Sequence, residues 1–293
     1  MISSILKRTR DPVVLNNIKL HNDVITDPEQ IKNQITYHFE NWTKLNNTNT
    51  DEWKLWQNQY TPKSSIYSIW YEGLLEPITI EEVINTIREA PTKKAAGHTG
   101  ITNENLKHLG SKAIMLLTEI YNTCMKIQDI PGQWKKGVVY PISKKPIFTG
   151  NLNQTRPITL IEHVRKILTK ILTNKTTKVL AKYDILNPYN YVALPRTSTA
   201  EPIHILTHII EDANINNKEL WLLSQDMSKA YDSIHIPLLM KAMQRIKIPE
   251  PIVNLLGNIF VGRTNQVITN FGNTQSYQVY DGVDQGEMIV SIL

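Results

Sequence analysis

The sequence is poor in cysteine and contains no long apolar run. A single cysteine, Cys124, excludes a disulfide framework and a cysteine-rich zinc site, and the eight histidines show no His-Glu-X-X-His spacing. We expect Cys124 to be a small core residue inside a helix. No stretch of about 18 apolar residues occurs, and the N-terminal basic residues follow the short apolar stretch, the reverse of a secretory signal. These absences predict a soluble, intracellular protein without a membrane span.

Positive charge is concentrated in the middle third of the chain. The net charge of +5 divides into 9 Lys and Arg against 12 Asp and Glu over residues 1–90, 15 against 4 over 91–180, and 8 against 11 over 181–293. Such asymmetry is typical of a surface that meets a polyanion, most commonly nucleic acid. A solubilising face would carry the same charge, so this pattern alone leaves both interpretations open.

The chain divides into a lead-in, residues 1–75, and a longer part, residues 76–293. The lead-in is polar and rich in Asn and Thr, and we expect it to be helical and loosely ordered, with one clear helix capped by Asp27 and started by Pro28. The longer part has helices first and then strands mixed with helices, which predicts an α+β fold rather than a doubly wound sheet. Helical periodicity occurs at 79–90, 111–128, 161–183 (with a basic face), 198–213, 237–246 and 249–260, and extended segments are predicted at 135–146, 153–161, 220–226, 264–271 and 276–283.

The stretch LLSQDMSKAYDSI, residues 222–234, contains the first candidate site residue. Asp226 ends an apolar run, and a carboxylate at the end of a strand is a natural ligand for a hard cation such as Mg²⁺. An isolated aspartate at such a place is more often a turn or helix-cap residue. Asp232 could pair with Asp226 as the acid and base of a glycosidase-like site, but nothing else in the chain supports sugar chemistry.

Basic residues flank the two extended segments of the middle third. Lys144, Lys145 and Arg156 could hold phosphates, Arg through a bidentate fork and Lys as a point charge, or they could simply protect a solvated sheet edge. Gln285 and Gly286 offer a side-chain amide next to a backbone that can approach a ligand closely. An ordinary turn explains these last two residues equally well.

Six short motifs follow one another along the chain: KKAAGHTGI, WKKGVVYPISKK, TRPITL, LPRTSTAEPI, SQDMSKAYDSI and GVDQGE. Each motif is weak alone, but six in sequence make a chance resemblance unlikely. In this order they resemble the reverse transcriptases of non-LTR (LINE-type) retrotransposons. The resemblance covers roughly residues 75–293 and implies a right-hand polymerase fold, with fingers and a partial palm following a mainly helical lead-in.

The resemblance also implies roles for the candidate residues. Asp226 matches the first metal-binding aspartate, and Tyr231 matches the aromatic residue under the sugar, which would collide with a 2′-hydroxyl. Lys144 and Arg156 match residues that hold the incoming triphosphate, whereas Gln285 and Gly286 match the segment against the new base pair. The implied partners are an RNA template, a DNA primer and dNTPs, and the implied cofactor is Mg²⁺, which such enzymes use as a pair of ions. Placement in the nucleus or cytoplasm stays open.

The printed sequence ends at Leu293, before the Tyr-X-Asp-Asp hairpin that supplies the family's remaining metal-binding carboxylates. Because one carboxylate cannot hold two metal ions, we expect this chain as written to have little or no polymerase activity. Three alternatives remain: a catalytically silent nucleic-acid-binding remnant, a non-functional pseudogene product, and a generic Mg²⁺-dependent phosphotransferase.

Overall fold

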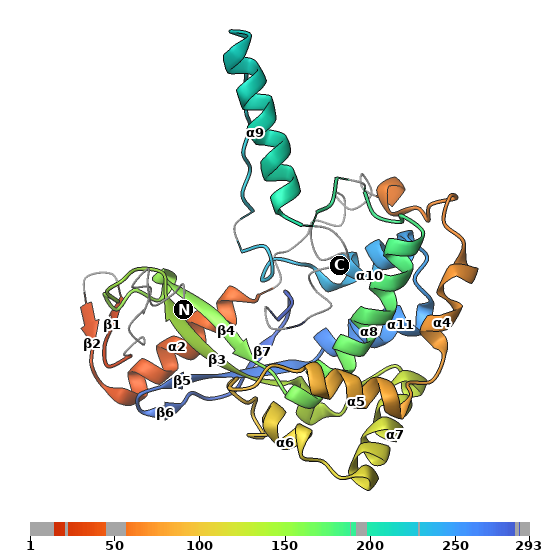
Figure 1. The fold of residues 1–293 in the computed structure, drawn as a ribbon. Helices are drawn as coiled ribbons and strands as arrows, with labels where there is room; N and C mark the ends of the chain where they lie inside the picture. The colour runs from red at the N-terminus through yellow and green to blue at the C-terminus, as the bar shows by residue number, and fades with distance from the viewer. Residues whose placement is uncertain are drawn as a thin grey trace.

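Helices and strands are both present, so the predicted α+β class is confirmed (Figure 1). A sheet covered by one long helix stands beside a helical body, and a further helix projects from the rest (Figure 1). In the part of the chain that the structure describes, no helix combines the length and apolar character needed to cross a membrane. The computed structural model describes residues 15–20, 23–44, 57–187, 189–191, 198–227, 229–284 and 287.

The main sheet is formed by segments far apart in the sequence. Strand β3 (Lys136–Ser143) pairs antiparallel with β4 (Thr155–Leu160) and parallel with β5 (Arg263–Thr269). Alternate residues of β5 are buried, the period expected of a strand that packs on one face. The extended segments predicted at 135–146, 153–161, 264–271 and 276–283 are therefore confirmed. The shorter strands are β6 (Gly272–Asn273) and β7 (Tyr277–Val279), both paired with β5, and the separate hairpin of β1 (Ile18–Leu20) and β2 (Asp23–Ile25).

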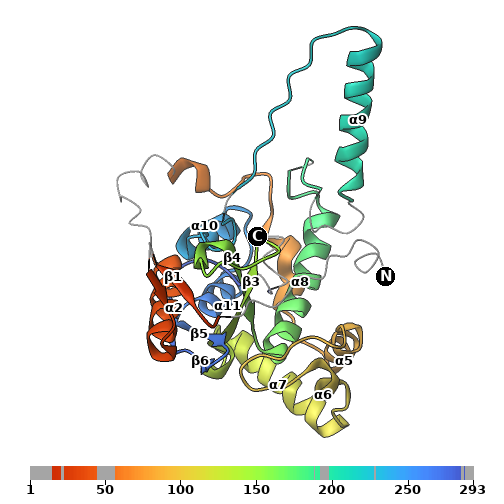
Figure 2. The same ribbon diagram turned by 90° about the vertical axis from the view of Figure 1, so that its left-hand side faces the viewer.

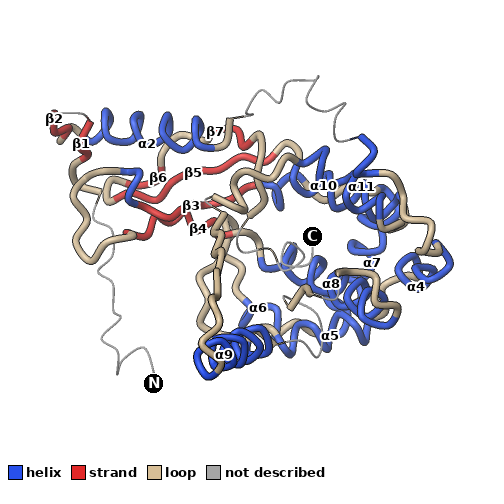
Figure 3. Tube along the Cα trace, turned by 90° about the horizontal axis from the view of Figure 1, so that it is seen from above, coloured by secondary structure: helices blue, strands red, loops and turns tan. Residues whose placement is uncertain are grey.

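Helix α2 (Pro28–Trp42) packs on this sheet (Figure 3). The Asp27 side chain accepts a hydrogen bond from the Gln30 amide, and Pro28 occupies the first turn, as the sequence predicts. The buried face of α2 joins sheet residues in one hydrophobic cluster, so the clearest helix of the lead-in shares its core with the sheet. This cluster contains Leu15, Ile18, Ile31, Ile35, Phe39, Val139, Leu152, Val267, Tyr277 and Val279.

The helical body has its own, larger core. Helix α5 begins with the predicted cap at Thr79, whose hydroxyl and backbone exchange hydrogen bonds with Glu82. On helix α8, Lys178 and Lys182 are exposed, whereas Arg165 is almost completely buried. The helices of the body are α4 (Glu72–Leu75), α5 (Ile80–Glu89), α6 (Asn103–Lys107), α7 (Ser111–Ile127), α8 (His163–Lys182), α10 (Ile236–Arg245) and α11 (Glu250–Phe260), with 3-10 turns η1 (Gln57–Tyr60), η2 (Ser68–Tyr71) and η3 (Gly132–Lys135). A further 3-10 turn, η4 (Leu152–Gln154), lies between β3 and β4 and packs in the sheet cluster.

Helix α9 (Ala200–Ile215) and the returning segment 216–227 form an arm that stands away from the body (Figures 1 and 2). The strand predicted at 220–226 is wrong: these residues form no ladder with any described strand, and the side chains of Trp221 and Leu223 are exposed. The apolar run is a signal for burial, but a strand also needs hydrogen-bonding neighbours, and the described sheet is elsewhere.

Candidate functional site

Asp226 lies near the base of the arm, in the segment that returns from α9. Its side chain is exposed and makes no hydrogen bond or ion pair with another described residue. The carboxylate is therefore free to bind a cation that arrives from solvent. The sequence predicted that Asp226 ends a strand. In the structure, the described residues directly before Asp226 form no paired strand.

Lys144 and Arg156 lie together at one end of the β3–β4 hairpin. Arg156 pairs with Ile142 in the ladder, two residues before Lys144, and both basic side chains are exposed. The Lys144 amide donates to the Gln154 carbonyl at 2.7 Å, which closes the hairpin. Lys145 is exposed in the same turn. This arrangement presents two or three cations at one edge, as a phosphate-binding site requires.

The motif that contains Asp226 and the motif GVDQGE meet in space. The amide of Val283 donates to the Tyr231 carbonyl at 2.8 Å, and that of Gly282 donates to the Ile234 carbonyl at 2.9 Å. Gly282 has a φ of +83°, and a Cβ there would lie 2.8 Å from the Asp232 carbonyl oxygen. Glycine is thus required for both its backbone angle and the close approach. Tyr231 is partly exposed at this junction.

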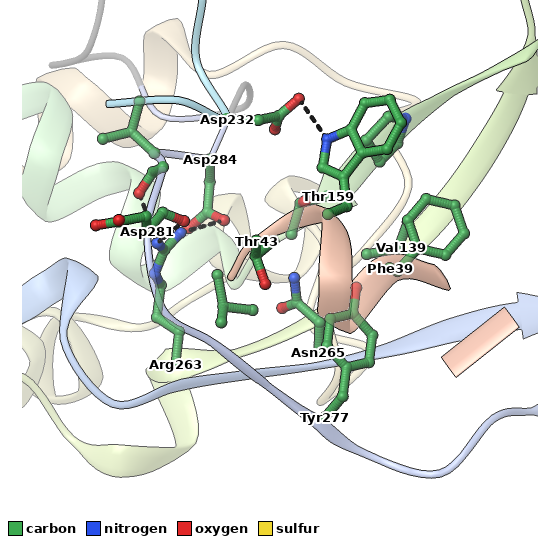
Figure 4. Close-up of a pocket in the computed structure, with 15 residues that line it drawn as sticks. Phe39, Thr43, Val139, Thr159, Asp232, Arg263, Asn265, Tyr277, Asp281 and Asp284 are labelled. Atoms are coloured by element: carbon green, nitrogen blue, oxygen red, sulfur yellow. Dashed lines mark hydrogen bonds and ion pairs between the residues drawn. The ribbon is translucent and has the colours of Figure 1, made fainter. Parts of the chain in front are cut away.

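Asp232 points toward the end of α2. Its Oδ2 accepts a hydrogen bond from the Trp42 indole Nε1 at 3.0 Å, shown by a dashed line in Figure 4. Burial raises the pKa of Asp232, while the Trp42 hydrogen bond and Lys229 oppose that shift. Asp232 is therefore engaged in a contact between the 229–233 turn and the end of α2.

A small cavity lies beneath this junction (Figure 4). Its volume of about 30 Å³ accommodates roughly one or two water molecules and no nucleotide. The α2 residues Phe39 and Thr43 meet Asp232 and Asp284 around it. The cavity therefore marks where the lead-in helix, the sheet and the two motifs converge.

Four charged side chains form a buried cluster on the far side of this junction. Arg165 Nη2 contacts Asp284 Oδ2 at 2.8 Å and Glu287 Oε2 at 2.6 Å, and Arg263 Nη1 contacts Asp284 Oδ1 at 2.8 Å. The Thr169 hydroxyl donates to Glu287 Oε1 at 2.5 Å. All four charges are buried, so each depends on its partners to offset the loss of water.

The pKa of Asp284 reflects this competition. Burial alone would raise the pKa of its carboxyl, but Arg263 and Arg165 hold it below its ordinary value. The pKa of Arg165 is raised: burial opposes the charged form, and Glu287 and Asp284 outweigh that effect. Both shifts favour the charged forms of Asp284 and Arg165, as an ion pair requires.

Sequence reasoning missed this cluster, although a signal was present. Arg165 lies on the helical stripe of Leu168 and Leu172, where a charged residue among apolar ones indicates a buried partner. Gln285 and Gly286, which the sequence singled out, lie outside the described residues. Their neighbours Asp284 and Glu287 are both held by Arg165.

The loop of the first motif closes against the start of α8. The buried Glu162 carboxylate accepts hydrogen bonds from the Thr99 amide at 2.8 Å and the Thr99 hydroxyl at 2.6 Å. Beside this contact lies a pocket of about 470 Å³ with Lys94, Lys166 and Lys170 in its wall. Burial lowers the pKa of Lys166, an effect to which Arg165 adds and which the neighbouring carboxylates oppose. The pocket offers ammonium groups to an anion.

The described residues do not assemble a complete two-metal site. Within that part of the chain, no three His, Cys, Asp or Glu side chains gather to hold a metal ion. Asp232 is engaged by Trp42, and Asp284 is engaged by two arginines. Of these three aspartates, Asp226 alone has an exposed carboxylate, the kind of oxygen ligand that Mg²⁺ prefers.

Comparison with known proteins agrees with the resemblance inferred from the motifs. The chain is 26% identical over 219 residues to a probable RNA-directed DNA polymerase from transposon BS of Drosophila melanogaster, a match that covers 75% of this chain and 24% of the relative. It is 27% identical to the corresponding probable polymerase from transposon X-element of the same fly, over 74% of this chain and 24% of the relative.

The mobile element jockey of that fly has an RNA-directed DNA polymerase that is 22% identical, over 73% of this chain and 23% of the relative. This chain thus spans about a quarter of the length of these curated relatives. Residues 142–293 match the reverse transcriptase (RNA-dependent DNA polymerase) family, which is more than half of the chain. The chain therefore belongs to the reverse transcriptase family, and its relatives are the polymerases of non-LTR retrotransposons.

Proposed function

We propose that this chain carries the nucleotide-binding part of an RNA-directed DNA polymerase, with residues 76–293 forming fingers and part of a palm. The observation that carries the proposal is the meeting of the Tyr231–Ile234 turn with residues 281–284, which brings two family motifs together. The names of the relatives support RNA-directed DNA synthesis as the reaction. The proposed partners are an RNA template, a DNA primer and dNTPs.

The side chains divide the work according to their chemistry. Lys144 and Arg156 bind the triphosphate, because two cations at one hairpin end match its charge and Arg offers a bidentate fork. Tyr231 contacts the sugar and excludes a 2′-hydroxyl by steric conflict. Gln285 and Gly286, outside the described residues, are proposed to meet the base pair.

Asp226 would hold Mg²⁺ through its exposed carboxylate. The ion supplies charge stabilisation for nucleotidyl transfer when bound, and substrate phosphates provide its other ligands. Asp226 itself only has to be accessible to solvent, and its exposed position on the arm meets this requirement.

Magnesium-dependent dNTP binding by the 293-residue chain tests this assignment. We expect Asp226→Asn to weaken binding roughly tenfold in Mg²⁺ and to have little effect in EDTA, because the variant removes charge with almost no change of shape. Asp212→Asn, which alters an exposed carboxylate on α9, is the matched control. Equal dNTP affinity of the wild type and Asp226→Asn in Mg²⁺ would contradict the metal role. Primer extension, measured alongside, reports whether binding leads to synthesis.

A second candidate, nucleic-acid binding without synthesis, is favoured by the lysine-lined pocket near the first motif. Lys94 and Lys170 would contact phosphates, so binding should weaken steeply with salt. Replacing both lysines with Gln should lower the slope of log K against log salt by about 1–2 for single-stranded RNA. An unchanged slope excludes this pocket as the binding surface. Duplex or RNA binding without dNTP binding would favour this candidate over the first.

A further inference from the structure

Trp42, the last residue of α2, contacts three charged side chains from two other parts of the chain. Lys229 Nζ lies 3.6 Å from the centroid of the Trp42 ring, and Lys144 Nζ lies 5.7 Å from the centroid of that ring. The indole Nε1 donates to Asp232 Oδ2 at 3.0 Å. Both lysines are within the range of a cation–π contact, and the Lys229 contact is the closer.

These contacts join two groups of candidate site residues. Lys144 belongs to the end of the β3–β4 hairpin, with Arg156 close by in the ladder. Lys229 and Asp232 belong to the turn that begins three residues after Asp226. In the described structure, one aromatic ring therefore lies between the proposed triphosphate-binding hairpin and the proposed metal-binding segment.

Two ammonium groups and one carboxylate contact the Trp42 indole, so the net charge around it is positive and suits an anion. The two ammonium groups are less than about 10 Å apart and repel each other. Asp232 offers one negative charge, and it is already hydrogen bonded to the indole. Lys144 also donates to the Asn153 carbonyl at 3.0 Å, a neutral partner. A polyphosphate placed between the two lysines would relieve this repulsion.

The end of α2 is firmly fixed, so Trp42 can act as a support. The Thr43 carbonyl accepts a hydrogen bond from the Asp281 amide at 3.2 Å, and Phe39 is buried in the sheet core. The His38 ring lies 5.6 Å from the Trp42 ring. The backbone that carries the indole is therefore anchored to the sheet and to residue 281.

We propose that Trp42 is a positioning residue of the nucleotide site, which holds Lys144 and Lys229 toward the triphosphate and fixes the turn after Asp226 through Asp232. This inference rests on the proposed dNTP-binding function. It makes α2, a helix of the lead-in, part of the site rather than a separate support for the sheet.

Two substitutions separate the contributions of the ring and its N–H group. Trp42→Phe keeps an aromatic face for the lysines and removes the donor to Asp232, whereas Trp42→Leu removes both. Expected losses of Mg·dTTP affinity are about two- to threefold for Trp42→Phe and about tenfold for Trp42→Leu. Trp70→Phe is the matched control, because Trp70 stacks on Tyr183 at 4.3 Å in the helical body. Its affinity should equal that of the wild type.

A double-mutant cycle shows whether Trp42 acts through Lys229. Lys229→Ala should weaken Mg·dTTP binding in the wild type and have little further effect in Trp42→Leu, because the contact is already lost. Independent, additive losses would overturn the positioning role. Thermal melting of each variant identifies any that fail to fold, and Trp42→Phe with its own Lys229→Ala cycle then decides the question.

Chemical reactivity gives a readout that does not need a nucleotide. Acetylation of the Lys144 and Lys229 amines, followed by peptide mass spectrometry, should be faster in Trp42→Leu than in Trp70→Phe. If wild-type protein binds no Mg·dTTP, the proposed function fails and the nucleotide role of Trp42 fails with it. If the wild type binds and Trp42→Leu binds equally well with unchanged lysine reactivity, the Trp42 inference alone is wrong.

Discussion

The acidic residues of the cluster around Arg165 differ from Asp226 on the arm in their burial and in their partners. In the cluster, Asp284 and Glu287 are both buried and paired with arginine. On the arm, Asp226 is exposed beside apolar residues that are also exposed, including Leu223. A carboxylate that is already neutralised cannot bind a cation well, whereas a free one can. In the cluster the carboxylates are held by arginines, whereas on the arm the Asp226 carboxylate is accessible to solvent, in keeping with the metal role proposed for it.

The two regions also differ in what a substitution can damage. Removing one member of a buried ionic cluster leaves its partners charged and desolvated, which costs far more than the intact pair contributes. Removing a side chain from the arm leaves only solvent-exposed neighbours. We therefore expect the loss in the free energy of unfolding to depend more on the region of the substitution, cluster or arm, than on the type of residue that is replaced.

Arg165→Met is expected to have the largest effect. It leaves the buried Asp284 and Glu287 without a shared partner, so the free energy of unfolding should fall by about 3–5 kcal/mol. Chemical denaturation or thermal melting measures the loss. Asp212→Asn is the matched control, since it breaks an exposed ion pair with Lys218 on the arm and should change stability by less than about 0.5 kcal/mol. Equal losses in the two variants would break the comparison.

Gly282→Ala should come next, because it disturbs the junction beside the cluster. The methyl group meets the Asp232 backbone at 2.8 Å and the residue must keep a φ of +83°. Together these effects should cost roughly 2–3 kcal/mol. Gly262→Ala is the control for φ alone: it has a φ of +72° with open space around its Cβ, and should cost about 1 kcal/mol. Similar melting temperatures for the two variants would rule out the close approach as a cause.

The pH dependence of stability tests the effect of burial on a third titratable residue, His38 of α2. Burial, aided by Lys229, lowers the pKa of His38 from 6.5 to about 4. Folding therefore favours neutral His38, and its contribution to stability is fully present above pH 6.5 and is lost as the pH falls from 6.5 toward 4. A loss of roughly 2 kcal/mol across that window is expected for the wild type and should be smaller for His38→Gln. Identical pH profiles of unfolding would contradict this role of His38.

Leu223→Lys on the arm should have the smallest effect. Its side chain is 96% exposed, so the change in the free energy of unfolding should lie within about 0.5 kcal/mol. Limited proteolysis offers an independent measure, with cleavage expected in segment 216–227 before the helical body, because that segment forms no ladder. A large destabilisation by Leu223→Lys would mean that the arm is packed in solution.

Local signals in the sequence predicted most elements of the fold. The caps at Asp27 and Thr79 and the alternation of β5 depend on neighbouring residues, and such patterns can be read along the chain. The prediction of a strand at 220–226 was wrong for the opposite reason, because strand pairing depends on residues that are distant in the sequence. The buried partners of Arg165 could not be read from the sequence, because Asp284 and Glu287 are more than a hundred residues away along the chain.

For the candidate site, too, motifs within one stretch of sequence could be predicted, whereas contacts between distant segments could not. Lys144, Arg156 and Tyr231 could be chosen by resemblance, and the structure places the first two at one hairpin end. The contact of Trp42 with Lys229 and Asp232 could not be predicted, because it joins the lead-in to a turn 190 residues away. The metal and nucleotide roles of these residues stay predictions until binding is measured.

The parallel pairing of β3 with β5 has a consequence for synthesis on the ribosome. Lys136 aligns with Thr264, so the β5 edge of β3 waits for residues made about 130 positions later, and the buried face of α2 waits about 230 positions for Val267. At the usual rate of translation the first delay is on the order of 10 s, during which β3 can pair with β4 and pack on α2 but has no partner along its β5 edge. Nascent chains of this protein should therefore depend on chaperones until β5 emerges.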